Sequence, residues 1–398
     1  MPRNSPAAWL GVADLPMALP LAALQAILVF AWVLPSAVIP VQALTLLGNA
    51  QKASVFFFGV SFAGLFGALV IPWLVHVAGR RAVFVLGGVL IVVSSAFMAF
   101  DEVWFLIIGM ALRILGFLCL DVSFEVSIME RIPRRAFARF EPVRMFAMGL
   151  GMIIGPWFGA RLSLDVGVWS PFAIVAVMTT GLCVYMMRKR LVEPLREAPI
   201  ADRTPNPLRF VARFLRQPRL RLAWVLAMGR SAWWTMFFIY VPIYCVESGL
   251  GKEMGGIILS VGSAPILLVP LWGKLGQWIG LRKLLAFAFM TTGVVTMAVA
   301  VAVAADQPWL GVALLLAAAT CASVIDTVGN GLFLRAVHPH ERPEMASVYT
   351  TYREVAHLGP PGVFSALLTV FTLPVVFVTS GLSLIAVTWL TRYIPKRY

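Results

Sequence analysis

The chain has 398 residues, of which 60% are hydrophobic and only 13% are charged. A soluble globular protein carries about 25% charged residues, so this composition excludes a soluble fold and requires lipid as the solvent for much of the chain. The formal net charge of +14 does not indicate nucleic-acid binding, because the basic residues gather in short loops between long apolar runs.

Twelve apolar runs are long enough to cross a bilayer, which takes about 20 residues of helix. The first six cover residues 18–41, 54–76, 82–100, 103–128, 142–163 and 170–188. The second six cover residues 222–245, 254–278, 283–304, 308–335, 345–370 and 373–391. These runs predict an all-α membrane protein with twelve transmembrane helices. We expect two six-helix bundles, at residues 1–190 and 221–398, joined by a basic linker at 191–220.

Basic residues occupy alternate loops between these runs. The longest polar segment, Arg188 to Arg221, is rich in arginine, whereas intervening loops such as Asp101–Glu102 and Asp306–Gln307 are short and neutral or acidic. Lys and Arg are retained on the cytoplasmic side of a membrane. The pattern predicts that the linker and both chain termini face the cytoplasm, in a multi-pass protein of the bacterial cell inner membrane.

The two halves of the sequence repeat each other. Gly79 begins a basic loop after the second run, and Gly280 begins one after the eighth, 201 residues later. Asp121 in the fourth run corresponds in the same way to Asp326 in the tenth. A duplicated six-helix unit is typical of secondary transporters, which bind substrate between the halves near the middle of the membrane.

Loop motifs in both halves resemble the major facilitator superfamily, and the resemblance covers nearly the whole chain. The family's signature between helices 2 and 3, G-x-x-x-D-R-x-G-R-R, is similar to residues 72–81. That stretch keeps the final Gly-Arg-Arg and has a histidine at the acidic position. The motif residues of the two loops are His76, Gly79, Arg80 and Arg81, and Gly273, Gln277, Gly280 and Arg282. The resemblance implies the twelve-helix fold of this family.

The fifth run is similar to a signature of the family's exporters, G-x-x-x-G-P-x-x-G-G. Its residues here are Gly151, Gly155, Pro156 and Gly159, with Ala160 at the last position. Glycines four residues apart let two helices approach closely, and a proline bends its helix. The resemblance favours an exporter. The alternative is that these residues pack the fifth helix tightly, as they would also do in an importer.

A charge inside an apolar run is costly unless it faces water or a partner, and eight of the charged residues in these runs are candidates for function. They are Arg113, Asp121, Glu125, Arg144, Arg230, Asp326, Arg353 and Glu354. Four arginines face four acids, so extensive pairing is expected. Three interpretations stay open: salt bridges that close the cytoplasmic side of the cavity, a proton-carrying acid at Glu125 or Asp121, and contact with a charged substrate. We assign proton coupling or gating to all of these residues except Arg230.

Arg113 also stands where proton-coupled members of the family have an arginine, which by resemblance supports proton coupling. The first run carries no charged residue between Leu15 and Ala50, so coupling has to use residues elsewhere.

Aromatic residues beside the charged ones are candidates for a substrate cavity. The cavity residues that we predict are Arg230, Trp233, Trp234, Phe237, Tyr349, Tyr352 and His357. Aromatic rings suit a flat, apolar or cationic ligand, although they also occur at lipid-facing positions. His357 either relays protons with Glu354, three residues away, or is a packed, hydrogen-bonded side chain.

Metal and enzyme chemistry find little support in the sequence. The four cysteines, Cys119, Cys183, Cys245 and Cys321, form no CxxC pair. Met145, Met148 and Met152 are spaced for one helix face that would suit Cu(I), but methionine is also a common core residue. We expect no cofactor, no metal and no enzymatic activity.

The sequence as a whole favours a secondary active transporter that exports a small organic molecule by alternating access, coupled to protons. The alternative is a proton-coupled importer of a polar metabolite such as a sugar or organic acid. It draws on the acid of helix 4 and the arginine of helix 5, which resemble those of sugar–proton symporters in the family. The expected partners are the substrate, protons and the lipid bilayer, without nucleic acid, and we expect the protein to function as a monomer.

Overall fold

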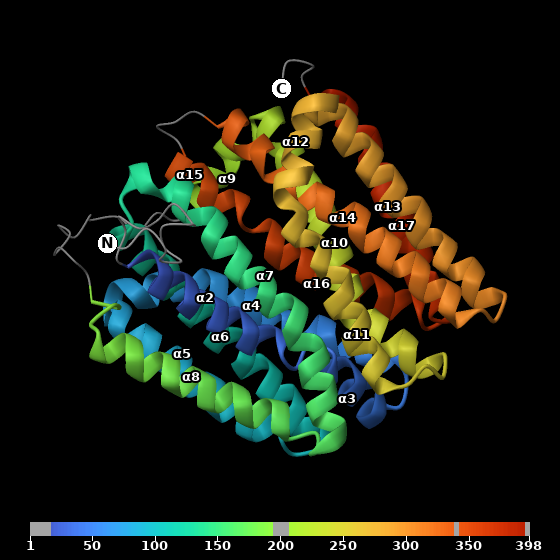
Figure 1. Ribbon diagram of the computed structural model, residues 1–398, viewed down its shortest axis with the longest axis horizontal. Helices are drawn as coiled ribbons and strands as arrows, with labels where there is room; N and C mark the ends of the chain where they lie inside the picture. The colour runs from blue at the N-terminus through green and yellow to red at the C-terminus, as the bar shows by residue number, and fades with distance from the viewer. Residues whose placement is uncertain (1–16, 194–206, 338–341, 395–398) are drawn as a thin grey trace, which may run out of the picture. The chain divides into compact units, whose positions relative to one another are not determined.

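The structure, a computed structural model, describes residues 17–193, 207–337 and 342–394, and every regular element in these ranges is a helix (Figure 1). The helices before the linker are α2 (Ala18–Val33), α3 (Val38–Leu47), α4 (Ala50–Ala78), α5 (Arg80–Met98), α6 (Val103–Arg131), α7 (Arg134–Asp165) and α8 (Ser170–Arg188). Those after it are α9 (Pro207–Leu215), α10 (Pro218–Glu247), α11 (Lys252–Ser263), η1 (Ala264–Leu268), α12 (Val269–Ile279), α13 (Leu281–Ala304), α14 (Pro308–Ala336), α15 (Arg342–Tyr349), α16 (Tyr352–Leu367), α17 (Pro374–Leu390) and η2 (Thr391–Tyr393). The all-α prediction is confirmed.

Eleven helical segments of the described residues are long and apolar enough to cross a membrane. Each corresponds to one of the predicted runs. The predicted run 345–370 is not among them, because it is divided at Thr350 and Thr351 into α15, with 8 residues, and α16, with 16. The chain is therefore a multi-pass membrane protein with eleven well-defined spans, and a twelfth crossing at α15–α16 stays a prediction.

Prolines interrupt two of the predicted runs. The first run becomes α2 and α3, since Pro35 has no backbone N–H to donate to the carbonyl of Ala31. The run 254–278 becomes α11, η1 and α12, with Pro265 and Pro270 near the two junctions. These breaks leave backbone carbonyls that need partners from neighbouring helices.

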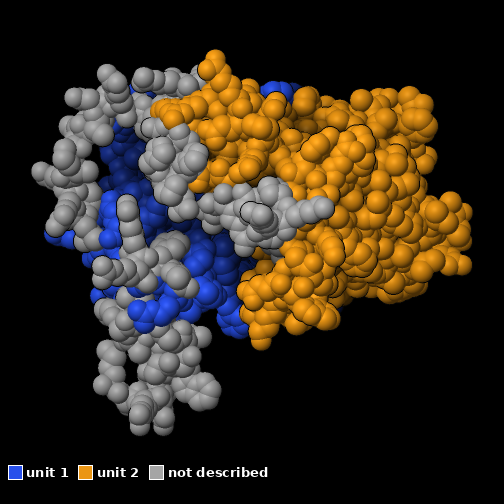
Figure 2. Space-filling model, turned by 90° about the horizontal axis from the view of Figure 1, so that it is seen from above, with its two compact units in different colours: residues 1–39, 62–204 blue, residues 40–61, 205–398 orange. Residues whose placement is uncertain are grey.

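The chain forms two compact units, coloured separately in Figure 2. The first contains residues 1–39 and 62–204, and the second contains residues 40–61 and 205–398. The division after residue 204 falls inside the predicted linker, of which residues 194–206 lie outside the described residues. Residues 40–61, from α3 and the start of α4, belong to the second unit. There the hydroxyl of Tyr240 donates to Ser54 Oγ at 2.7 Å.

Helix neighbours repeat between the two halves. In the first, α2 lies against α7, and α5 lies against α6 and α8. In the second, α10 lies against α16, and α13 lies against α14 and α17. The same helices of each six-helix repeat therefore meet, which agrees with the repeated motifs in the sequence.

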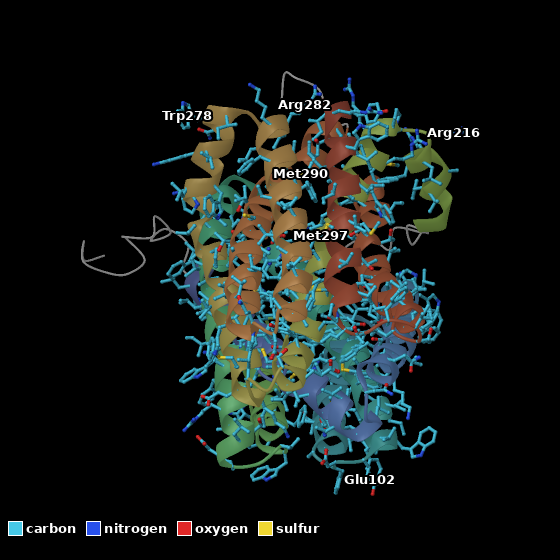
Figure 3. All side chains as sticks on the ribbon, turned by 90° about the vertical axis from the view of Figure 1, so that its right-hand side faces the viewer. Glu102, Arg216, Trp278, Arg282, Met290 and Met297 are labelled. Atoms are coloured by element: carbon cyan, nitrogen blue, oxygen red, sulfur yellow. The ribbon has the colours of Figure 1, made fainter. Side chains whose placement is uncertain are left out.

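Within the second unit, Arg216, Trp278 and Arg282 lie toward one end, and Met290 and Met297 follow along α13 away from that end (Figure 3). The basic residues that end the linker and the loop before α13 thus share one end of this unit, as the charge pattern requires. Both chain termini, residues 1–16 and 395–398, lie outside the described residues, so their cytoplasmic location stays a prediction.

Candidate functional site

Among the side chains that the structure describes, four arginines are buried in the polar interior: Arg80, Arg113, Arg144 and Arg230. Removing a guanidinium from water is expensive unless hydrogen bonds and charges replace the lost hydration. The hydrogen-bond and ion-pair partners of each arginine therefore indicate the role of that part of the protein.

Arg144 on α7 binds two carboxylates. Its Nε and Nη2 donate to the two carboxylate oxygens of Glu141 at 2.9 and 2.8 Å, and its Nη1 donates to Glu125 on α6. Arg144 is buried, whereas the side chains of Glu125 and Glu141 are 30% and 28% exposed. Asp121, one turn before Glu125, is near enough to act on it electrostatically. We call Glu125, Glu141 and Arg144 the Arg144 cluster.

Glu125 and Arg144 were both expected among the paired charges, whereas sequence reasoning did not single out Glu141. A signal was available, because Glu141 stands three residues before Arg144, on the same face of one helix. Glu141 lies one residue before the predicted fifth run, which begins at residue 142, so it falls outside the predicted spans.

The hydrogen bonds of Arg113 on α6 go to backbone carbonyls. Its Nη2 donates to the carbonyl of Ala31 at 3.3 Å and to that of Trp32 at 2.5 Å. Its guanidinium also lies 5.0 Å from the ring centroid of Trp32 and 4.9 Å from that of Phe117. Arg113 thus supplies the donor that Pro35 withholds at the end of α2.

The exporter-like glycines of α7 face the same break in α2. A Cβ at Gly155 would stand 2.6 Å from a side-chain carbon of Val33, and one at Gly159 would overlap the carbonyl of Leu34. Gly151 lies near the carbonyl of Ala26, one turn or more before the break. Pro156 lies inside α7 without ending it. These glycines therefore let α7 contact the backbone of α2.

The loop motif of the first half is anchored through Arg80. Its Nη2 pairs with Glu130 at 3.0 Å, and its Nε donates to the carbonyl of Val192 at 2.6 Å. Arg81, which is exposed, lies 3.5 Å from Glu193. This arrangement holds the end of the sixth predicted span against α5 and α6.

Matching residues begin the helices after both loops. Gly79 and Gly280 precede α5 and α13 with φ values of 80° and 89°, which favour glycine. His76 is exposed at the end of α4. Gly273 and Gln277 lie on α12, and Arg282 lies at the start of α13. The two loops thus share a backbone conformation as well as a charge pattern.

The second unit contains a different charged site around Arg230 on α10. Its Nε lies 3.1 Å from Asp326 Oδ1 on α14, and its Nη2 donates to the Tyr352 hydroxyl at 3.1 Å. The indole N–H of Trp234 donates to the other oxygen of Asp326 at 2.5 Å. We call Arg230, Trp234, Asp326 and Tyr352 the Arg230 cluster. The sequence repeat indicates Asp326 as the acid, and the structure shows that its partner, Arg230, comes from α10.

The remaining predicted cavity residues divide into two groups. Trp233 and Phe237 stack at 5.1 Å inside the second unit and are 2% and 0% exposed, with the Trp233 indole donating to Thr296 Oγ1 at 3.0 Å. They pack the unit in this conformation. Tyr349, by contrast, lies beside the Arg230 cluster, 5.1 Å from the ring of Tyr352.

Three predicted residues follow along α16. The Nε of Arg353 lies 3.4 Å from the Tyr352 hydroxyl, and Glu354 is half-buried next to it. His357 Nδ1 lies 3.2 Å from Thr235 Oγ1 on α10, which is within hydrogen-bonding distance. A proton relay between His357 and Glu354 stays a prediction. The charged and aromatic residues of α10, α14 and α16 therefore gather in one region.

Within the part of the chain that the structure describes, no three His, Cys, Asp or Glu side chains lie close enough together to hold a metal ion. All four cysteines, which fall in the described ranges, are free thiols.

Comparison with known proteins identifies the fold. The chain matches crystal structures of a POT family transporter in complex with 5-aminolevulinic acid (TM-score 0.73, 15% identity, 98% of this chain and 97% of that one). It also matches a POT family transporter with a thioalcohol-conjugated peptide (TM-score 0.68, 14% identity, 93% and 94%). A third match is a mutant of the nucleoside transporter NupG (TM-score 0.71, 12% identity, 94% and 99%). At these identities the likeness shows the fold alone. No curated relative matches the sequence.

The family assignment is independent of these structures. The model of the Major Facilitator Superfamily matches residues 21–360, which is most of the chain. The transporter class predicted from the loop motifs is confirmed at this level, and the chain belongs to the major facilitator superfamily.

Proposed function

We propose that this protein is a proton-coupled secondary transporter that exports a small organic molecule by alternating access. The observation that carries the proposal is that Arg144 forms ion pairs with two carboxylates, those of Glu141 and Glu125. The resemblance of residues 151–160 to the family's exporter signature favours export, whereas their contact with the break in α2 is a packing role that both directions of transport would share. The transporters of similar fold were solved with 5-aminolevulinic acid and with a conjugated peptide, which supports a solute of modest size.

Glu125 is the residue that we assign to the proton. Glu141 binds Arg144 through both of its carboxylate oxygens, so Arg144 keeps a counter-charge when Glu125 is neutralised. With both glutamates ionised, the cluster carries one negative charge in excess, and Asp121 adds to the repulsion that Glu125 experiences. Protonation of Glu125 removes that excess and releases its contact with Arg144, which couples proton binding to movement of α6 against α7.

The test is a Glu125→Gln variant in proteoliposomes that contain a pH-sensitive dye. Drugs, sugars, organic acids and amino acids are added in turn, and the solute-dependent movement of protons is recorded. We expect proton movement in the wild type and its loss in Glu125→Gln, which still exchanges solute down its gradient. Glu130→Gln is the matched control, since Glu130 pairs with Arg80 outside the Arg144 cluster. Unchanged solute-dependent proton movement in Glu125→Gln would mean that this carboxylate serves only as a salt bridge.

Uptake of a polar metabolite is the second candidate function. It is favoured by the direct pairing of the acid on α6 with the arginine on α7. Transport into right-side-out and inside-out vesicles separates the two directions. Export in exchange for protons predicts accumulation in inside-out vesicles whose lumen is acidic. Accumulation only in right-side-out vesicles whose outer medium is acidic would establish uptake instead.

The proposed topology has α15–α16 as the twelfth crossing and both termini in the cytoplasm of a bacterial cell, with a monomer as the working unit. Cysteines introduced at Asp101 and Arg282 should react with a membrane-impermeant maleimide from opposite sides. Labelling of both from the same side would exclude this topology.

A further inference from the structure

Beside the Arg230 cluster lies a polar atom without a partner. Tyr349 is the last residue of α15, its ring stacks on Phe333 at 4.2 Å, and it is 7% exposed. Its hydroxyl is buried and makes no hydrogen bond to any described residue. Leaving a buried hydroxyl unsatisfied is unfavourable, so the orphan oxygen of Tyr349 points to a partner that the empty protein does not supply.

Two arginines converge on the neighbouring tyrosine. Arg230 Nη2 lies 3.1 Å and Arg353 Nε lies 3.4 Å from the same oxygen of Tyr352. Their guanidinium carbons lie 5.7 and 6.0 Å from the centre of the Tyr352 ring. Two cationic side chains, which can only donate hydrogen bonds, therefore meet at the Tyr352 hydroxyl.

Both arginines also act electrostatically on Tyr349, which places the orphan hydroxyl within the same field. Two acids with described side chains lie in this region: Asp326, whose oxygens contact Arg230 and Trp234, and Glu354, which follows Arg353 in the chain. The negative charges of Asp326 and Glu354 offset the positive charges of Arg230 and Arg353. The two arginines can therefore lie near each other in the absence of a ligand.

We propose that Tyr349, Tyr352 and Arg353, supported by Arg230, form a binding site for the carboxylate of an organic acid, which is the class of solute that the protein transports. This rests on the proposed transport function and names its substrate. A carboxylate offers acceptor lone pairs on two oxygens, which matches the guanidinium donors and the phenolic hydroxyl of Tyr349. The ring of Phe333, stacked on Tyr349, gives the site an apolar wall for the rest of the solute.

The test measures binding by thermal shift on the purified full-length protein in detergent. The probes are benzoate, phenylacetate and succinate, each compared with its amide, which has the same shape without the charge. A ligand that binds the folded state raises the melting temperature by mass action. We expect the acids to raise it and the amides not to, and Arg353→Gln to lose the effect. Arg392→Gln is the control, since Arg392 stacks on exposed Trp389.

Tyr349→Phe gives the sharper test. Its hydroxyl has no partner in the empty protein, so the melting temperature without ligand should stay equal or rise. The acid concentration needed for a given rise in melting temperature should increase about tenfold, as expected when one hydrogen bond to a charged group is lost. Tyr240→Phe should show the reverse pattern, because its hydroxyl binds Ser54: a lower melting temperature with unchanged acid binding.

Equal shifts with acids and amides, no shift with any acid, or wild-type acid binding in Tyr349→Phe would each overturn the proposal. Its outcome is separate from that of the coupling test. Acid binding should persist in Glu125→Gln, so a failure of proton coupling leaves the site intact. Conversely, proton movement driven by sugars or drugs without acid binding would overturn only the carboxylate site.

Discussion

The Arg144 cluster and the Arg230 cluster each hold a buried arginine, and both arginines are 7% exposed, yet their surroundings differ. Arg144 binds two glutamates, and the region carries an excess of carboxylates. Arg230 binds one aspartate whose second oxygen is occupied by Trp234, and a tyrosine and a second arginine lie beside it. The first arrangement suits a group that gains and loses a proton, and the second suits an incoming anion.

The comparison also shows how a sequence repeat can preserve one partner and change the other. Asp326 occupies the place in α14 that Asp121 occupies in α6, and its arginine comes from α10, whereas the arginine of α7 in the first half pairs with Glu125, one turn beyond Asp121. Each half has therefore kept an acid on its fourth helix while recruiting different neighbours. The two halves of a duplicated transporter can divide coupling and recognition in this way.

The largest expected effect is that of Arg144→Gln. It leaves two carboxylates without their shared counter-charge, and breaking a buried ion pair from one side costs about 3–5 kcal/mol. Arg230→Gln leaves one carboxylate that still accepts from Trp234, so its cost should be smaller. Thermal unfolding of both purified variants measures the difference. A larger loss in Arg230→Gln would contradict the contrast drawn between the clusters.

An intermediate effect is expected for Arg113→Ala, because Arg113 belongs to neither cluster. The carbonyls of Ala31 and Trp32 lose their donor, which costs about 1–3 kcal/mol for a buried group. Transport should be abolished while the amount of protein in the membrane fraction stays normal. The control is Arg161→Ala, which removes an exposed ion pair with Asp165 and should change stability by less than about 1 kcal/mol. Wild-type flux in Arg113→Ala would remove this residue from the mechanism.

The smallest effect is expected for Trp234→Phe, which keeps an aromatic ring and deletes one hydrogen bond to Asp326. Asp326 keeps its ion pair with Arg230, so the loss should lie at the low end for a single hydrogen bond, about 0.5 kcal/mol. The melting temperature should fall slightly, and the affinity for organic acids should change because Arg230 reorients toward Asp326. Unchanged values for both quantities would show that Trp234 does not position Asp326.

Much of the architecture could be predicted from the sequence, since lipid imposes strict rules on length and polarity. Runs of about 20 apolar residues identify spans. The isolated charges within them, such as Glu125 and Asp326, indicate the polar interior. The spacing of Gly151, Gly155 and Gly159 indicated a close helix contact, and these residues lie against the backbone of α2 in the structure.

Partner choice could not be predicted in the same way. Glu141 falls just outside the predicted fifth run and lies on α7, with both of its carboxylate oxygens accepting from Arg144. The division of the run 345–370 at Thr350 and Thr351 likewise had no clear signal in its hydropathy.

The sequence by itself determined where eleven long apolar spans lie, the polarity of the loops between them and the positions at which charge enters the apolar runs, because these depend on local composition. Only the tertiary structure decided what each charge binds. Arg113 meets carbonyls at the end of α2, where Pro35 withholds a donor, and Arg230 meets an acid 96 residues further along the chain at Asp326. Such contacts depend on how each helix is rotated about its axis. That rotation is set by close approaches between distant residues, such as Gly159 and Leu34.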